Sequence, residues 1–158
     1  MTSAVRARDI IVMLDRRHVD DVFLPEVSTK SSARKSYGRM DAWAMRRSYT
    51  KPMTWGYEVK VSRSDFLRDD KWTKYLDYCK QFYFVAPKGI ITIDELPQEV
   101  GLLEAVGSRL MTRRKAAIRD IGIPEEFAQS LLINRMPSGI ESAEISTFDR
   151  MSARRRSA

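Results

Sequence analysis

Cysteine and histidine are nearly absent from this 158-residue chain, which has one of each, Cys79 and His18. A single cysteine excludes a disulfide within the chain, and one free thiol is typical of proteins from a reducing cytoplasm. The same scarcity argues against a zinc site of the usual Cys/His type. We therefore expect a cytoplasmic protein whose chemistry, if it has any, relies on other side chains.

Long apolar runs, internal repeats and low-complexity blocks are also missing. No run is long enough to cross a bilayer, and residues 1–15 mix charges into their apolar positions, unlike a secretory signal. The length suits one domain with a real core. We expect that domain at residues 1–137, followed by a polar, basic tail at residues 138–158.

The net charge is +7, which favours a polyanionic partner, most simply nucleic acid. A basic protein without such a partner would carry the same charge, but here the cations are clustered. One cluster surrounds a single acid, Asp41, and the other precedes Asp120 without any acid of its own. The first comprises Lys30, Arg34, Lys35, Arg39, Arg46, Arg47 and Lys51, and the second comprises Arg109, Arg113, Arg114, Lys115 and Arg119.

Hydrophobic periodicity predicts a mixture of helices and strands. Helices are expected at residues 5–17, 70–80 and 124–136, and strands at 22–27, 40–47, 54–62, 81–86, 90–93 and 101–106. Pro25 makes the first strand an edge strand or irregular, and residues 28–38 form a loop. We expect His18 on the surface, and Phe127, Leu131 and Leu132 facing the core. This order predicts an α/β fold with a central mixed β-sheet flanked by helices.

Three residues on the predicted hairpin can supply phosphodiester chemistry. Glu58 and Lys60 are two apart on one strand and project to the same side, while Asp41 lies on the preceding strand. Magnesium prefers oxygen ligands such as Asp41, Glu58 and the backbone carbonyl of Val59. A metal would polarise the phosphate, and a nearby ammonium could activate water or neutralise developing charge. From the residues alone, an ion-paired strand surface fits as well as a metal-dependent site.

The wider pattern resembles the PD-(D/E)XK nuclease superfamily, in particular the MmcB-type DNA-repair endonucleases. Residues 38–41, G-R-M-D, resemble the segment with the first metal-binding aspartate, although Met40 stands where the superfamily has proline. Residues 57–66, Y-E-V-K-V-S-R-S-D-F, resemble the central motif. Further matches are D-K-W at 70–72, Tyr75, Cys79, F-Y-F at 82–84, L-P at 96–97 and G-L at 101–102. The likeness covers about half the chain well and becomes loose after Ala105.

The resemblance implies a restriction-endonuclease-like core and a bacterial or phage-encoded deoxyribonuclease, most simply an endonuclease. It implies Mg²⁺ or Mn²⁺ at Asp41 and Glu58, with Lys60 as the catalytic lysine. Many members add an accessory acid. Glu26 is our first candidate for it, and Asp9 and Asp15 are the next candidates. Nucleases of this fold often form homodimers, and a homodimer is our expectation here.

The remaining polar residues near the motif have two readings. Ser62 and Arg63 could contact nucleic acid together with Lys30, Arg34, Lys35 and Arg39. Alternatively, Ser64 or Asp65 caps the next helical turn, and Asp70 caps the helix after it. Two functions compete with the nuclease: a non-catalytic nucleic-acid-binding or regulatory protein on the same fold, and a protein-interaction module. Metal-dependent cleavage separates the first of these from the nuclease.

Overall fold

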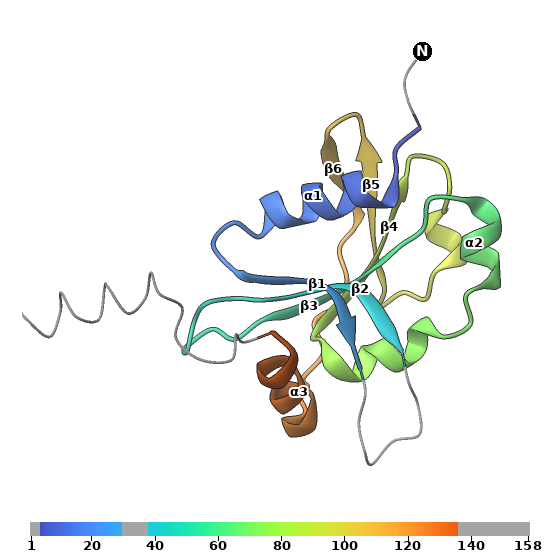
Figure 1. The fold of residues 1–158 in the computed structure, drawn as a ribbon. Helices are drawn as coiled ribbons and strands as arrows, with labels where there is room; N and C mark the ends of the chain where they lie inside the picture. The colour runs from blue at the N-terminus through green and yellow to red at the C-terminus, as the bar shows by residue number, and fades with distance from the viewer. Residues whose placement is uncertain (1–3, 30–37, 136–158) are drawn as a thin grey trace, which may run out of the picture.

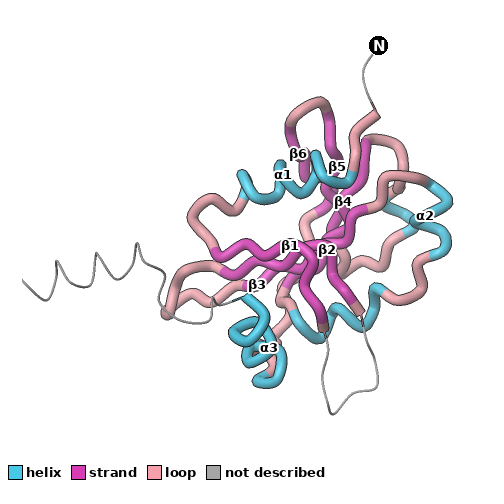
Figure 2. Tube along the Cα trace, viewed as in Figure 1, coloured by secondary structure: helices cyan, strands magenta, loops and turns pink. Residues whose placement is uncertain are grey.

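A six-stranded mixed β-sheet forms the centre of the molecule in a computed structural model that describes residues 4–29 and 38–135. The strands follow one another across the sheet in chain order, and helices cover both faces (Figures 1 and 2). The first three strands are antiparallel, β3, β4 and β5 are parallel, and β6 is antiparallel to β5. The strands are β1 (Val22–Ser28), β2 (Arg39–Met45), β3 (Thr54–Val59), β4 (Gln81–Pro87), β5 (Gly101–Val106) and β6 (Arg109–Arg114).

The helical segments lie before, between and after these strands. They are α1 (Ala7–Arg17), α2 (Arg63–Arg68), η1 (Trp72–Tyr78), η2 (Ile93–Glu95) and α3 (Glu125–Arg135), of which η1 and η2 are 3₁₀ helices. The prediction of an α/β fold with a mixed sheet flanked by helices is confirmed, and the arrangement is consistent with a restriction-endonuclease-like core. Among the described residues, no helix is long and apolar enough to cross a membrane.

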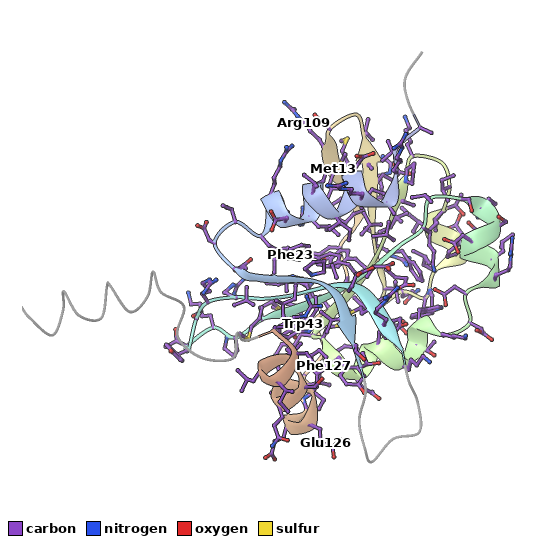
Figure 3. The ribbon with its side chains drawn as sticks, in the orientation of Figure 1. Met13, Phe23, Trp43, Arg109, Glu126 and Phe127 are labelled. Carbon is purple, nitrogen blue, oxygen red and sulfur yellow. The ribbon has the colours of Figure 1, made fainter. Side chains whose placement is uncertain are left out.

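Two apolar clusters hold the layers together, one on each face of the sheet. Ile10 and Leu14 of α1 pack with Tyr57, Val59 and neighbouring residues of the central strands. The opposite face is richer in aromatic residues, which come from β2, β4, η1 and α3. Figure 3 shows Trp43 and Phe127 together on the α3 side, with Met13 and Phe23 on the α1 side. Burial on both faces explains the continuous apolar sequence of β4.

Gly56 lets η1 approach the sheet closely. A Cβ at this position would lie 2.7 Å from Sγ of Cys79 and 2.8 Å from Sδ of Met40. The glycine side of β3 is therefore filled by η1, and the alternate residues Trp55, Tyr57 and Val59 face α1. The predicted alternation of β3 is confirmed over these residues.

Several predicted elements differ from the structure. The helix expected at residues 70–80 is a 3₁₀ helix beginning at Trp72, and the strand expected at 90–93 is replaced by a turn and η2. Strand β6 was not predicted, because its three arginines belong to the second cation cluster of the sequence and its apolar residues do not alternate with them. The prediction for Phe127 and Leu131 is confirmed, but Leu132 is exposed. The predicted tail at 138–158 lies outside the described residues.

Candidate active site

Asp41 joins strand β2 to strand β3 through its side chain. Its Oδ2 accepts a hydrogen bond of 2.7 Å from the backbone N–H of Val59. The register pairs Ala42 with Tyr57, so continuing it by one residue places Asp41 opposite Glu58. Burial raises the pKa of Asp41, and the hydrogen bond from Val59 and the charge of Lys60 offset part of this effect. The carboxylate is thus fixed beside the other candidate acid, as the hairpin prediction required.

Strand alternation breaks at Asp41 and at Glu26, its counterpart on β1. The register runs from Pro25 with Ala42 to Val27 with Met40, and skips the pair between them. Ala42 packs towards α1, whereas Met40 joins the aromatic face, although regular alternation would put both on one side. Glu26 has a φ of 51°, a value that L-residues adopt at a cost. Strands β1 and β2 are therefore both irregular where Glu26 and Asp41 lie opposite each other.

Glu26 is close to the site in the fold, but its side chain turns to an exposed cation. Its Oε1 lies 3.8 Å from Nη2 of Arg39, and both side chains are about two-thirds exposed. The carbonyls of Pro25 and Glu26 accept hydrogen bonds from Arg135 of α3. Glu26 and Asp41 line one hollow, so the accessory role remains a prediction. The carboxylate of Asp9 accepts a hydrogen bond from the N–H of Arg6 at the start of α1.

Glu58 and Lys60 form a buried ion pair. Nζ of Lys60 donates to Oε1 of Glu58 at 3.1 Å, and the two residues are 6 % and 8 % exposed respectively. Burial, followed by the charge of Asp41, raises the pKa of Glu58 to about 8. Such a carboxyl is held largely protonated at neutral pH unless a further positive charge approaches it.

Asp69 is a third buried acid, and the sequence analysis did not identify it. Its Oδ2 lies 2.7 Å from Nζ of Lys60. Burial lowers the pKa of Lys60, but the contacts with Asp69 and Glu58 outweigh it, so the net shift is upward. Burial alone would raise the pKa of Asp69, but the contact with Lys60, the hydrogen bond from the N–H of Lys71 and the contact with Glu58 reverse this to a net lowering. The ion pair therefore keeps Lys60 an ammonium and Asp69 a carboxylate at neutral pH.

The donor set suits a divalent cation. Two buried side-chain oxygens of the described residues lack a hydrogen bond, Oε2 of Glu58 and Oδ2 of Asp69, and only the second has an ammonium at ion-pair distance. With Asp41, Glu58 and Asp69 ionised, three negative charges face the single ammonium of Lys60, which leaves an excess of two. Asp41, Glu58 and the carbonyl of Val59 are the residues that would hold the ion. In the described ranges no three or more His, Cys, Asp or Glu side chains are grouped so that they could hold a metal ion together, so an ion here would rest on Asp41, Glu58, the Val59 carbonyl and water.

A hollow of about 420 Å³ opens beside Asp41. Helix α1, the irregular part of β1 and the end of α3 form its walls. Arg8 is an exposed cation on the α1 wall. The lining residues are Ala7, Arg8, Ile11, Pro25, Glu26, Asp41, Val59 and Arg135. The hollow gives Asp41 a route to solvent, whereas Val59, which also lines it, is as buried as Glu58 and Lys60.

The predicted nucleic-acid contacts next to the motif have partners within the protein. Oγ of Ser62 accepts the N–H of Asp65, so Ser62 itself, and neither Ser64 nor Asp65, is the N-cap of α2. Arg63 forms an ion pair with Glu95 and donates to the carbonyl of Ile90. Lys30, Arg34 and Lys35 lie outside the described residues. Asp70 does not cap η1, whose N-cap is Lys71.

The second cation cluster is largely structural. The guanidinium of Arg114 donates to four backbone carbonyls between Ile93 and Val100. Arg113 pairs with Glu104 at 3.2 Å, and Arg119 donates to the carbonyl of Cys79. Three of the five cations therefore have contacts within the fold, whereas Arg109 and Lys115 are exposed, and a polyanionic partner for the cluster stays a prediction.

His18 is buried, which contradicts its predicted place on the surface. It is 4 % exposed, and its Nε2 lies 2.7 Å from the hydroxyl of Tyr57. Its Nδ1 lies 2.8 Å from Oδ2 of Asp21. Burial lowers the pKa of His18, and the contact with Asp21 opposes this shift. The imidazole anchors the end of α1 to β3 on the side of the sheet that faces α1.

Fold and site together define a mixed-sheet α/β protein with a buried cluster of acids and one lysine at the end of a central strand. The family model described as "DNA repair protein MmcB-like" matches residues 3–130, and the chain belongs to this MmcB-like family. A solved structure, a protein of unknown function from Silicibacter pomeroyi (SPO1766), has a TM-score of 0.59 and 22 % identity, covering 89 % of this chain and 97 % of that chain. That likeness concerns the fold alone. No curated protein sequence matches.

Proposed function

We propose that the protein is a metal-dependent nuclease that hydrolyses DNA phosphodiester bonds in DNA repair or in phage or bacterial DNA processing. The observation that carries the proposal is the buried carboxyl group of Glu58: its Oε1 accepts a hydrogen bond from the ammonium of Lys60, its Oε2 has no hydrogen-bond partner, and burial and the charge of Asp41 raise its pKa. Membership of a DNA-repair family supports DNA as the substrate. The order Asp41, Glu58, Lys60 resembles the PD-(D/E)XK superfamily, whose members share this chemistry.

Each residue has a role in this proposal. Asp41, Glu58 and the Val59 carbonyl would hold Mg²⁺ or Mn²⁺, and the bound ion would supply charge stabilisation at phosphorus and activation of water. Lys60 is an ammonium at neutral pH, because its pKa is raised, so it acts as a donor to the attacking water or to a phosphate oxygen and not as a base. Glu26 is the accessory acid, reached through the hollow that it lines with Asp41.

The alternative is a non-catalytic nucleic-acid-binding or regulatory protein on the same fold. The exposed Arg39 and Arg8 would then bind phosphate without any reaction. A homodimer and a cytoplasmic location also belong to the proposal, and sedimentation with and without DNA would test the first of these. Circular DNA has no ends, so cleavage of circular substrates would distinguish an endonuclease from an exonuclease.

The test is cleavage of supercoiled plasmid and of circular single-stranded DNA with Mg²⁺, Mn²⁺ or chelator. Glu58→Gln and Lys60→Met are expected to lower the rate about 100-fold or more, by removal of a metal ligand and of the ammonium. The matched controls are Glu99→Gln and Lys88→Met, which remove the same groups at exposed positions. Cleavage of circular substrates would establish endonuclease action. Binding of DNA without cleavage under either metal would favour the alternative.

A further inference from the structure

The lysine of the proposed site is held by a carboxylate from outside the sheet. Asp69 follows α2, nine residues after Lys60, and its Oδ2 returns to 2.7 Å from Nζ of Lys60. This is shorter than the 3.1 Å between Nζ and Oε1 of Glu58. The three side chains are 8 %, 9 % and 11 % exposed for Lys60, Asp69 and Glu58. The contact is therefore shielded from water, unlike an ordinary surface ion pair.

Local structure fixes Asp69 from both sides. The N–H of Lys71 donates to its Oδ1 at 2.9 Å, and its own N–H donates to the carbonyl of Phe66 at 3.2 Å. Phe66 in turn packs edge-to-face on Phe84 in β4, with ring centroids 5.5 Å apart. Ser62 begins the same helix at its other end. The chain from Lys60 to Lys71 thus folds back on itself, and its hydrogen bonds hold Oδ2 of Asp69 next to the ammonium of Lys60.

The backbone of Lys60 is fixed as well. Its N–H donates to the carbonyl of Val85 at 2.9 Å, which extends the parallel pairing of β3 with β4. Main chain and ammonium are therefore held by different elements. An ammonium has three protons: Nζ of Lys60 donates one to Oε1 of Glu58, and Oδ2 of Asp69 lies at ion-pair distance from the same nitrogen.

We propose that Asp69 is the positioning residue of Lys60: it holds the ammonium so that Glu58 keeps one oxygen free for a divalent cation. This inference rests on the proposed nuclease function. Without Asp69, the ammonium has only the carboxylates of the metal site as counter-charges and competes with the cation for them. Neither the family description nor the sequence motif assigns Asp69 a role.

The chain offers a neighbouring control. Asp70 has the same side chain, follows Asp69 directly and is exposed. Asp69→Asn keeps an oxygen for the N–H of Lys71 but turns an uncharged amide towards Lys60. Asp70→Asn removes one negative charge from the same turn without touching the lysine. A comparison of the two separates loss of the contact from a general change in charge.

We would measure kcat and KM for DNA cleavage with Mg²⁺ in wild type, Asp69→Asn, Asp70→Asn, Lys60→Ala and the double variant Asp69→Asn/Lys60→Ala. The expectation is a fall in kcat of about 10- to 100-fold for Asp69→Asn, with KM unchanged, and no change for Asp70→Asn. Because Asp69 acts through Lys60, the double variant should cleave as slowly as Lys60→Ala alone. Additive losses, or equal effects of the two Asn variants, overturn the proposal.

A second measurement reads the contact without catalysis. The lysine ammonium protons of the metal-free protein, observed by ¹⁵N NMR, should give one exchange-protected signal that Lys60→Ala and Asp69→Asn remove and Asp70→Asn retains. If wild type cleaves no DNA, the nuclease proposal fails, and with it the role of Asp69 in catalysis. The protected NMR signal would then still report the contact between Asp69 and Lys60. If wild type cleaves DNA but Asp69→Asn is fully active, the nuclease proposal stands and the role of Asp69 is overturned.

Discussion

The side chain of Asp41 takes the place of a backbone acceptor for Val59. The N–H of Val59, the residue between Glu58 and Lys60, donates to Oδ2 of Asp41 at 2.7 Å. One hydrogen bond therefore sets the distance between the two strands at the level of the proposed metal ligands. It also gives Asp41 a structural role that is separable from its charge.

Substitution of Asp41 should separate these roles. Asp41→Asn retains an oxygen for Val59 and should unfold in urea at nearly the wild-type midpoint in chelator. Asp41→Ala leaves a buried N–H without its acceptor and should lower the free energy of unfolding by about 1–3 kcal/mol. Both should lose stabilisation by Mg²⁺, which wild type is expected to show. Equal stability of the Asn and Ala variants would contradict the assigned hydrogen bond.

Glu58 predicts a stability that falls as pH rises. Its pKa in the folded protein is about 8, against an ordinary value of 4.5. Between these values the folded state holds a proton that the unfolded state has released, so the free energy of unfolding decreases with pH. Glu58→Gln carries no such proton. In chelator it should match wild type below about pH 4.5 and be the more stable protein above about pH 8. Urea unfolding across this range is the measurement, with Glu99→Gln as the control that should follow wild type.

Arg8 should contribute to DNA affinity through the hollow beside Asp41. Arg8→Ala is expected to weaken binding and to reduce the slope of log K against log salt by about 1, the value for one lost phosphate contact. Arg16→Ala removes the same exposed charge two helical turns further along α1. Fluorescence anisotropy in chelator, at several salt concentrations, would compare the two variants. If Arg8→Ala and Arg16→Ala give equal slopes of log K against log salt, the hollow is not part of the DNA-binding surface.

Arg114 should matter for stability and not for DNA binding. Its guanidinium serves four carbonyls of the segment before β5, and hydrogen bonds that involve a charged group contribute about 1.5–3 kcal/mol each. We expect Arg114→Ala to lower the free energy of unfolding by about 2 kcal/mol or more. Arg109→Ala, at an exposed position on the same strand, should change it by less than about 0.5 kcal/mol. A reversed order in thermal unfolding would show that the carbonyl contacts contribute little.

His18 should make the protein less stable in mild acid. Burial lowers its pKa below the ordinary value of 6.5, so the unfolded state binds a proton between the two values and the folded state does not. The contribution to stability is present above about pH 6.5 and is lost as the pH falls below it. His18→Gln should reduce this acid-side loss in urea titrations. If the free energy of unfolding of His18→Gln falls as much in acid as that of wild type, the acid sensitivity comes from carboxylates elsewhere in the protein.

Features that depend on the sequence of a single strand could be predicted. The faces of β3, the burial of β4 and the edge position of β1 follow from side-chain period, apolar content and Pro25. The ion pair of Glu58 with Lys60 follows from their spacing in the same way. Asp69 was not predictable by this route, because its contact depends on a helix that begins at Ser62 and reverses the chain.

The errors share a related cause. Arg114 of β6 and the imidazole of His18 look solvated in the sequence because polar residues are mostly exposed. The fold instead supplies partners from distant segments: Arg114 finds carbonyls before β5, and His18 finds Tyr57 on β3. Pro25 indicated that β1 could be irregular, but the matching break at Asp41 on β2 was not predicted, since regular alternation is the only expectation that the pattern of that strand provides.

All three acids that surround the lysine, and the lysine itself, fall within residues 41–69, so the chemistry is encoded by one short continuous stretch. The strands and helix that follow, β5, β6 and α3, contribute packing and the far wall of the hollow, but none of these four charges. The four charged residues are therefore local in sequence, whereas the hollow beside Asp41 joins both ends of the fold, from α1 to Arg135 of α3. A change in α3 can thus alter one wall of the hollow without replacing any of these four residues.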